Sequence, residues 1–164
     1  MTKSQRIQYA KNLTKKINLK AEFREFAESG KTSRQACKVW GVNLQHIVKT
    51  LILYSKKDDV YACVVLLGSD KLNINKIRKF LKLRKLNLAP QEKVEALTSF
   101  KPGGVSPVAS LLCKNRFIDR KVIKKAVVYG AGGDECVYMK FSPKKLVKKI
   151  NGFYVKNISL NHSG

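Results

Sequence analysis

The stretch IVKTLILYSKKDDVYACVVLL, residues 47–67, contains two apolar segments separated by a polar turn. The segments Ile47 to Tyr54 and Val60 to Leu67 are rich in the β-branched and aromatic residues that favour strands. Lys56 to Asp59 between them is typical of a turn. We therefore predict a β-hairpin at the centre of the fold.

Lys49 is the unusual residue of this hairpin. Because side chains alternate between the two faces of a strand, Lys49 should share a face with Ile47, Leu51 and Leu53. An ammonium buried without a partner is costly, so Lys49 must reach solvent, pair with a carboxylate or bind an anionic ligand such as a phosphate. A lysine that discourages pairing at a sheet edge is the alternative interpretation.

A second unusual stretch is Phe100-Lys101-Pro102-Gly103-Gly104-Val105-Ser106-Pro107. Two glycines between two prolines let a backbone approach a ligand closely, and they expose amide N–H groups that can hold an anion or a developing oxyanion. An ordinary surface turn is the alternative interpretation.

The rest of the chain predicts helices and short strands in mixed order. We expect helices at Thr2 to Leu19, Ala21 to Ser29, Thr32 to Trp40, Asn73 to Leu83, Pro90 to Thr98 and Pro143 to Ile150. In the fourth of these, Ile74, Ile77, Phe80 and Leu81 should face inward. Further strands are expected at Leu86 to Ala89, Arg116 to Ile118, Ala126 to Tyr129, Cys136 to Phe141 and Tyr154 to Ile158. Since helices and strands do not alternate strictly, the prediction is a single-domain α+β fold with a mixed, largely antiparallel, curved sheet flanked by helices.

The charge balance favours a polyanionic partner. The 164 residues include 34 Lys and Arg against 11 Asp and Glu, a formal net charge of +23. Such an excess attracts phosphates and releases their counterions on binding, although it does not choose among tRNA, other nucleic acids and an acidic membrane. The apolar runs are far shorter than a membrane span and the start of the chain is polar, so we expect a cytoplasmic protein.

The cysteines and histidines predict no metal site. Cys37, Cys63, Cys113 and Cys136 are widely separated, and only His46 and His162 could join them. A structural zinc site usually takes closely paired ligands. Cysteine catalysis would need a nearby base, and His46, at a predicted helix-strand junction, is expected at the surface.

The pairing of Val48-Lys49-Thr50-Leu51 with Gly103-Gly104-Val105-Ser106-Pro107 resembles the pairing that marks the YbaK and prolyl-tRNA synthetase-associated aminoacyl-tRNA editing domains. The resemblance extends in order through the helix from Thr32 to Val42, the segment from Asp70 to Thr98 and the glycine loop, strand and helix from Val127 to Ile150. It implies a barrel-like closure of the sheet. It also implies an editing-domain-like core at 32–157, preceded by a basic helical segment at 1–30 and followed by a tail at 158–164.

The resemblance also implies an activity and a site. The family's members are small deacylases that hydrolyse the ester of a mischarged tRNA, without a cofactor. Carried over by position, the active-site residues are Lys49 and the turn Gly103, Gly104, Val105, Ser106 and Pro107. Thr50 and the loop glycines Gly130, Gly132 and Gly133 would border the substrate. Some alanine-specific members are expected to carry a histidine in that loop and this chain has none, so the amino acid stays open.

We therefore expect a trans-acting deacylase for tRNA misacylated with a small amino acid such as alanine, cysteine or serine. Its partners would be tRNA, docked on the basic helix residues Lys144, Lys145, Lys148 and Lys149, and an aminoacyl-tRNA synthetase. Two alternatives lack catalysis. One is a DNA-binding helix-turn-helix formed by Ser33 to Val42 and Asn43 to Leu51, and the other is a tRNA-binding partner of a synthetase.

Overall fold

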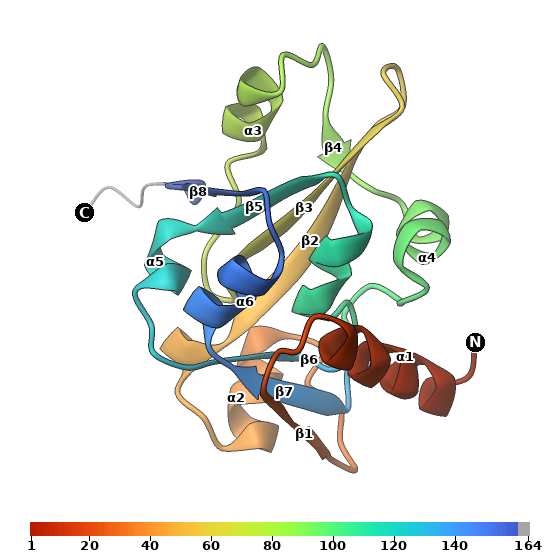
Figure 1. Cartoon of the computed structure of the whole chain (residues 1–164), viewed down its shortest axis with the longest axis vertical. Coiled ribbons are helices and arrows are strands. Elements are labelled where there is room, and N and C mark those ends of the chain that lie inside the picture. Colours follow the sequence, from red (N-terminus) through yellow and green to blue (C-terminus); the bar gives the residue numbers. More distant parts are fainter. Residues whose placement is uncertain (161–164) are drawn as a thin grey trace.

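The predicted hairpin forms the centre of the larger of two sheets (Figure 1). In the computed structural model, which describes residues 1–160, β2 (Val48–Ser55) and β3 (Val60–Leu67) pair antiparallel over their whole length. β4 (Asn87–Leu88) extends the sheet on the outer side of β2. On the other side, β5 (Asn115–Asp119) and β8 (Phe153–Lys156) add in parallel, giving the order β4-β2-β3-β5-β8.

The smaller sheet is antiparallel and joins distant parts of the chain. Its order is β1 (Ala21–Glu25), β7 (Val137–Phe141) and β6 (Val128–Ala131). A single parallel bridge between Ile47 and Tyr129 links it to the start of β2. The α+β class and the mostly antiparallel pairing are thus confirmed. The barrel-like closure is wrong, because the strands form two sheets that touch at this bridge.

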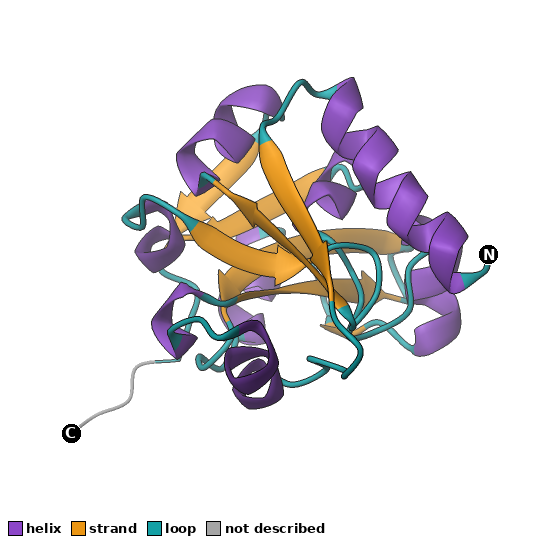
Figure 2. Ribbon diagram, turned by 90° about the horizontal axis from the view of Figure 1, so that it is seen from below, coloured by secondary structure: helices purple, strands orange, loops and turns teal. Residues whose placement is uncertain are grey.

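The helices surround the two sheets (Figure 2). Their bounds are α1 (Lys3–Lys16), α2 (Ser33–Trp40), α3 (Ile74–Phe80), α4 (Gln91–Thr98), α5 (Arg120–Ile123) and α6 (Pro143–Lys149), with 3-10 turns at η1 (Leu44–His46) and η2 (Pro107–Leu112). Thr2 and Thr32 begin α1 and α2 with capping boxes, and Gly41 ends α2 in the left-handed conformation. None of the helices in the described part has the length and apolar composition needed to cross a membrane.

The apolar side chains divide into three clusters. The largest lies between the sheets and is closed by α1 and α6, with Phe100, Met139 and Leu146 fully buried. The second, with Leu53, Leu66 and Phe117, fills the opposite face of the larger sheet beneath α3. The third is small: Ala36 and Trp40 of α2 pack on Ile47 and Tyr138. Both faces of β2 and β3 are therefore covered.

One predicted helix is a strand. Ala21 to Ser29 was expected to be helical, but Ala21–Glu25 is β1, paired with β7 from Ala21↔Phe141 to Glu25↔Val137. Phe26 continues this contact, since its N–H donates to the carbonyl of Cys136 at 2.8 Å. Pairing with a strand more than a hundred residues away decides the conformation of this short segment, and local helix propensity does not.

One further expectation holds only in part, and another is wrong. Phe80 packs edge-to-face on the buried Phe117, but it is 40% exposed and also contacts Tyr154 at the surface. The helix-turn-helix is also excluded. The segment that should form its recognition helix is the short 3-10 turn η1 followed by the β-branched residues of β2.

Candidate functional site

A gap in the strand pairing creates a cavity beside β2, which we call the main cavity because Lys49 lines it. β4 pairs with β2 at Leu53 and Tyr54, and β6 meets it at the Ile47–Tyr129 bridge. Between these contacts, the residues from Val48 to Leu51 line a cavity of about 340 Å³. An unpaired strand edge offers backbone N–H and C=O groups to a ligand.

Three segments close this cavity against the strand edge. The segment leading into α2 contributes Lys31 and Thr32, and α2 itself contributes Ser33, Ala36 and Trp40. The remaining walls come from the glycine turn, with Gly103 and Val105, and from the end of β6, with Ala131. The fold therefore brings together the lysine strand and the glycine turn, which are separated by about fifty residues in the sequence.

Lys49 lies half-buried in the wall of this cavity. Its Nζ donates to the backbone carbonyl of Asp70 at 2.5 Å, and the Asp70 carboxylate forms an ion pair with Lys121 at 2.6 Å. Desolvation lowers the pKa of Lys49 below 10.5, and the negative charge of Asp70 partly offsets this effect. An ammonium has three N–H donors, so the bond to Asp70 leaves Lys49 able to hold a second acceptor.

The glycine turn needs its glycines for two different reasons. Gly103 has φ +88°, a left-handed conformation that side chains disfavour. Gly104 is buried, and a Cβ on it would lie 3.0 Å from the Cα of Asp134. The Gly104 N–H is already used, because it donates to the carbonyl of Lys101 at 2.9 Å. Within the described residues, the amides of Gly103 and Val105 make no such backbone bond, and both residues line the cavity.

Ser106 and Pro107 lie behind the site. The Ser106 side chain is fully buried, and its Oγ donates to the sulfur of Met139 at 3.0 Å while accepting from the Val108 N–H at 3.4 Å. A Cβ on Gly130 would lie 2.8 Å from Cγ of Pro107. These residues fix the turn against β6 and β7, and neither Ser106 nor Pro107 lines the cavity.

The four predicted substrate-binding residues do not all line the main cavity. Thr50 lines the main cavity, whereas Gly130 and Gly132 allow close packing, Gly132 against Val137 and Phe23. Gly133, at φ +100°, lies against the backbone of Arg6 and lines a different cavity. From this loop, Ala131 is the residue that reaches the main cavity.

Sequence reasoning missed part of the α2 wall. Trp40 and Thr50 line the cavity, and Trp40 Nε1 and Thr50 Oγ1 are buried atoms with no hydrogen-bond partner among the described residues. Buried polar groups are normally paired, so these two atoms are exceptions in the wall of the cavity. The signal for Trp40 was weak, because a tryptophan on an amphipathic helix is usually an ordinary core residue.

The basic helix is separate from the cavity lining. Lys144, Lys145, Lys148 and Lys149 are all exposed on α6, which packs inward through Leu146 and Ile150. His46, expected at the surface, is half-buried at η1, where its Nδ1 lies 3.2 Å from the carbonyl oxygen of Val127.

Comparison with known proteins places this chain in a family. Residues 27–149 match the aminoacyl-tRNA editing domain, and the protein belongs to that family. The crystal structure of the hypothetical protein APE2540 is similar, with 31% identity, a TM-score of 0.80 and coverage of 92% of this chain and 98% of that one. A candidate trans-editing enzyme for prolyl tRNA synthetase shares the fold at 24% identity and a TM-score of 0.78, covering 98% of this chain and 99% of its own.

Proposed function

We propose that this protein hydrolyses the ester bond of misacylated tRNA in trans. The observation that carries the proposal is the cavity at the edge of β2, where a half-buried lysine and the uncommitted amides of a glycine turn meet. Membership of the editing-domain family supports the same activity.

Each element has a role in the proposed reaction. Water adds to the ester carbonyl, and the amides of Gly103 and Val105 hold the oxyanion that develops. Lys49 binds a polar or anionic group of the tRNA 3′ end and so positions the ester. Collapse of the tetrahedral intermediate releases the amino acid and leaves the ribose hydroxyl on the tRNA. The neighbouring hydroxyl of that ribose assists the water.

The size of the cavity sets the substrate class. A volume of about 340 Å³ has to hold the acyl group together with part of the terminal adenosine. We therefore propose small acyl groups, namely alanine, cysteine and serine, with larger cognate residues rejected by size. The exposed lysines of α6 would contact the tRNA backbone. The reaction would take place in the cytoplasm, either free or beside an aminoacyl-tRNA synthetase.

A deacylation panel tests the proposal. Purified protein is mixed with tRNA charged with alanine, cysteine, serine or proline, and the loss of acylated tRNA is followed with time. tRNA specific for proline is the first acceptor to test, because of the structural neighbour described above. We expect turnover of at least one small aminoacyl ester and none of prolyl-tRNA. Tight tRNA binding with no turnover of any ester would refute catalysis and leave a tRNA-binding partner of a synthetase.

A further inference from the structure

A second cavity lies on the other side of the glycine turn. Its volume is about 370 Å³, and its walls include Arg6 from α1, Lys101 and Gly104 from the turn, and Gly133 from the loop after β6. It shares Lys31 with the main cavity. Since Gly103 lines one cavity and Gly104 the other, a ligand that crosses the turn passes from the first into the second.

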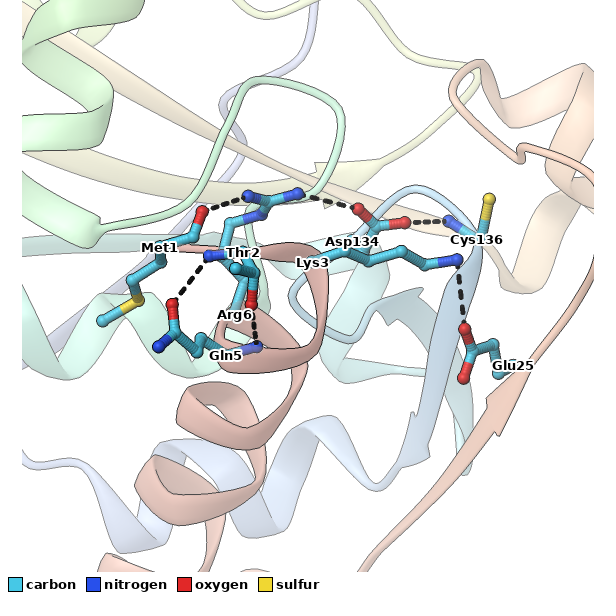
Figure 3. Close-up of polar contacts among 8 residues, drawn as sticks. All are labelled: Met1, Thr2, Lys3, Gln5, Arg6, Glu25, Asp134 and Cys136. Carbon is cyan, nitrogen blue, oxygen red and sulfur yellow. Dashed lines mark hydrogen bonds and ion pairs between the residues drawn. The ribbon is translucent and has the colours of Figure 1, made fainter.

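Arg6 is a buried residue of this wall, and Figure 3 shows its contacts with Met1 and Asp134. The residue is only 8% exposed; its Nη1 donates to the carbonyl of Met1 at 2.9 Å, and its Nη2 pairs with Oδ1 of Asp134 at 3.2 Å. The other carboxylate oxygen of Asp134 accepts from the N–H of Cys136 at 3.0 Å. Nε of Arg6 is buried with no hydrogen-bond partner among the described residues. Buried polar groups are normally paired with protein or ordered water, so this N–H is an exception.

The charge of the second cavity matches a single anion. Its positively charged groups are Arg6, Lys31 and Lys101, and its negatively charged groups are Asp134 and Glu135. Arg6 and Asp134 neutralise each other as an ion pair. Lys31, Lys101 and Glu135 remain, and their formal charges leave one positive charge in excess. A phosphodiester carries one negative charge and accepts hydrogen bonds from guanidinium and ammonium groups.

We propose that the second cavity binds the phosphodiester that joins the terminal nucleotide of the tRNA 3′ end to the nucleotide before it. This inference rests on the proposed function, because the aminoacyl ester would then occupy the main cavity. The RNA backbone crosses the Gly103–Gly104 turn between the two. The phosphate is held by Lys31 and Lys101, so Lys49 is left to act on the ester and the ribose.

Binding of the unacylated dinucleotide CpA tests the proposal without any hydrolysis. CpA contains one phosphodiester and adenosine contains none, and both are titrated into the full-length protein by NMR or calorimetry. We expect Lys31→Gln and Lys101→Gln each to raise the Kd for CpA roughly twofold to fivefold, the effect of losing one partly exposed charge pair. The affinity for adenosine should stay the same in Lys101→Gln, because Lys101 lines the second cavity and not the main one.

Two control variants sharpen the test. Glu135→Gln removes the opposing carboxylate, so it should lower the Kd for CpA by a similar factor. Lys57→Gln, at the exposed tip of the β2–β3 hairpin, should leave it unchanged. Arg6 is left intact, because its loss would also break the buried pair with Asp134.

The outcomes separate this inference from the proposed function. Equal weakening of CpA and adenosine in Lys101→Gln, an unchanged CpA affinity in that variant, or weaker CpA binding in Glu135→Gln would each overturn the phosphodiester site. A protein that binds CpA as predicted but releases no amino acid from tRNA would refute the deacylase alone. A deacylase whose KM for aminoacyl-CpA is unaffected by Lys31→Gln and Lys101→Gln would refute the second cavity alone.

Discussion

Replacement of Lys49 by methionine should separate activity from stability. Methionine keeps most of the length and the apolar contacts of the side chain and removes the ammonium that lies in the main cavity. A hydrogen bond to a charged group is worth about 1.5–3 kcal/mol, so turnover should fall by about 10- to 150-fold if the contact forms fully in the transition state.

The thermal stability of Lys49→Met should not fall together with its turnover. Desolvation lowers the pKa of Lys49, so the folded protein holds this proton less tightly than the unfolded chain does. The charged lysine therefore opposes folding at pH values below its folded pKa, and this cost disappears as pH rises past the unfolded value near 10.5. At neutral pH the variant should have a melting temperature equal to or above that of the parent protein.

The assay compares deacylation rates and melting curves for the parent protein, Lys49→Met and the control Lys57→Met. The pH dependence of kcat/KM adds a further check, after subtraction of spontaneous ester hydrolysis. An alkaline decline should begin below the ordinary lysine range in the parent protein and be absent from Lys49→Met. Unchanged turnover in Lys49→Met would remove this residue from the site. Parallel losses of turnover and melting temperature would instead make Lys49 a structural residue.

Three other variants test the turn, the basic helix and the core. Gly104→Val places a Cβ against the backbone of Asp134 and should reduce kcat by about 10²-fold or more with little change in tRNA affinity; matched losses in kcat and affinity would indicate general misfolding. Glutamine at all four basic positions of α6 should flatten the salt dependence of tRNA binding, by about 0.7–0.9 in log–log slope per lost phosphate contact, and should leave hydrolysis of aminoacyl-adenosine intact. The lysines replaced are Lys144, Lys145, Lys148 and Lys149. Asp119→Ala removes a fully buried carboxylate that accepts from the N–H groups of Lys121, Ile158 and Ser159, at a cost of about 3 kcal/mol. Thermal denaturation should show a fall of roughly 6–12 °C, and a shift within one degree would contradict this role for Asp119.

The parts of the fold that the sequence predicts are those with local signals. The hairpin follows from two apolar segments and a polar turn, and α2 follows from Thr32 and Gly41 at its ends. β1 has no comparable signal, because its five residues gain their hydrogen bonds from β7. The parallel pairing of β3 with β5 likewise depends on the whole chain. Pairing between segments that are far apart in the sequence cannot be predicted from the residue pattern within either segment.

The two motifs of the candidate site are visible in the sequence, and their surroundings come from tertiary contacts. Lys49 and Gly103 line the same cavity, whereas Gly104 lines the second one. The carbonyl of Asp70 could not be predicted as the partner of Lys49, since a backbone atom carries no sequence signal. The pair between Arg6 and Asp134 joins residues 128 positions apart, and each looks like an ordinary surface charge in the sequence.

The small third cluster places the α2 wall of the main cavity outside the large core. α2 supplies the side-chain wall of the main cavity, but it rests on Ile47 and Tyr138 and lies outside the large core between the sheets. The opposite walls come from the edge of β2, with Lys49, and from the glycine turn, where Gly103 is held at φ +88°. If the proposed function holds, substitutions on α2 would reshape acyl recognition without touching Lys49 or the turn. Duplicated copies of such a gene could then diverge toward different mischarged tRNAs.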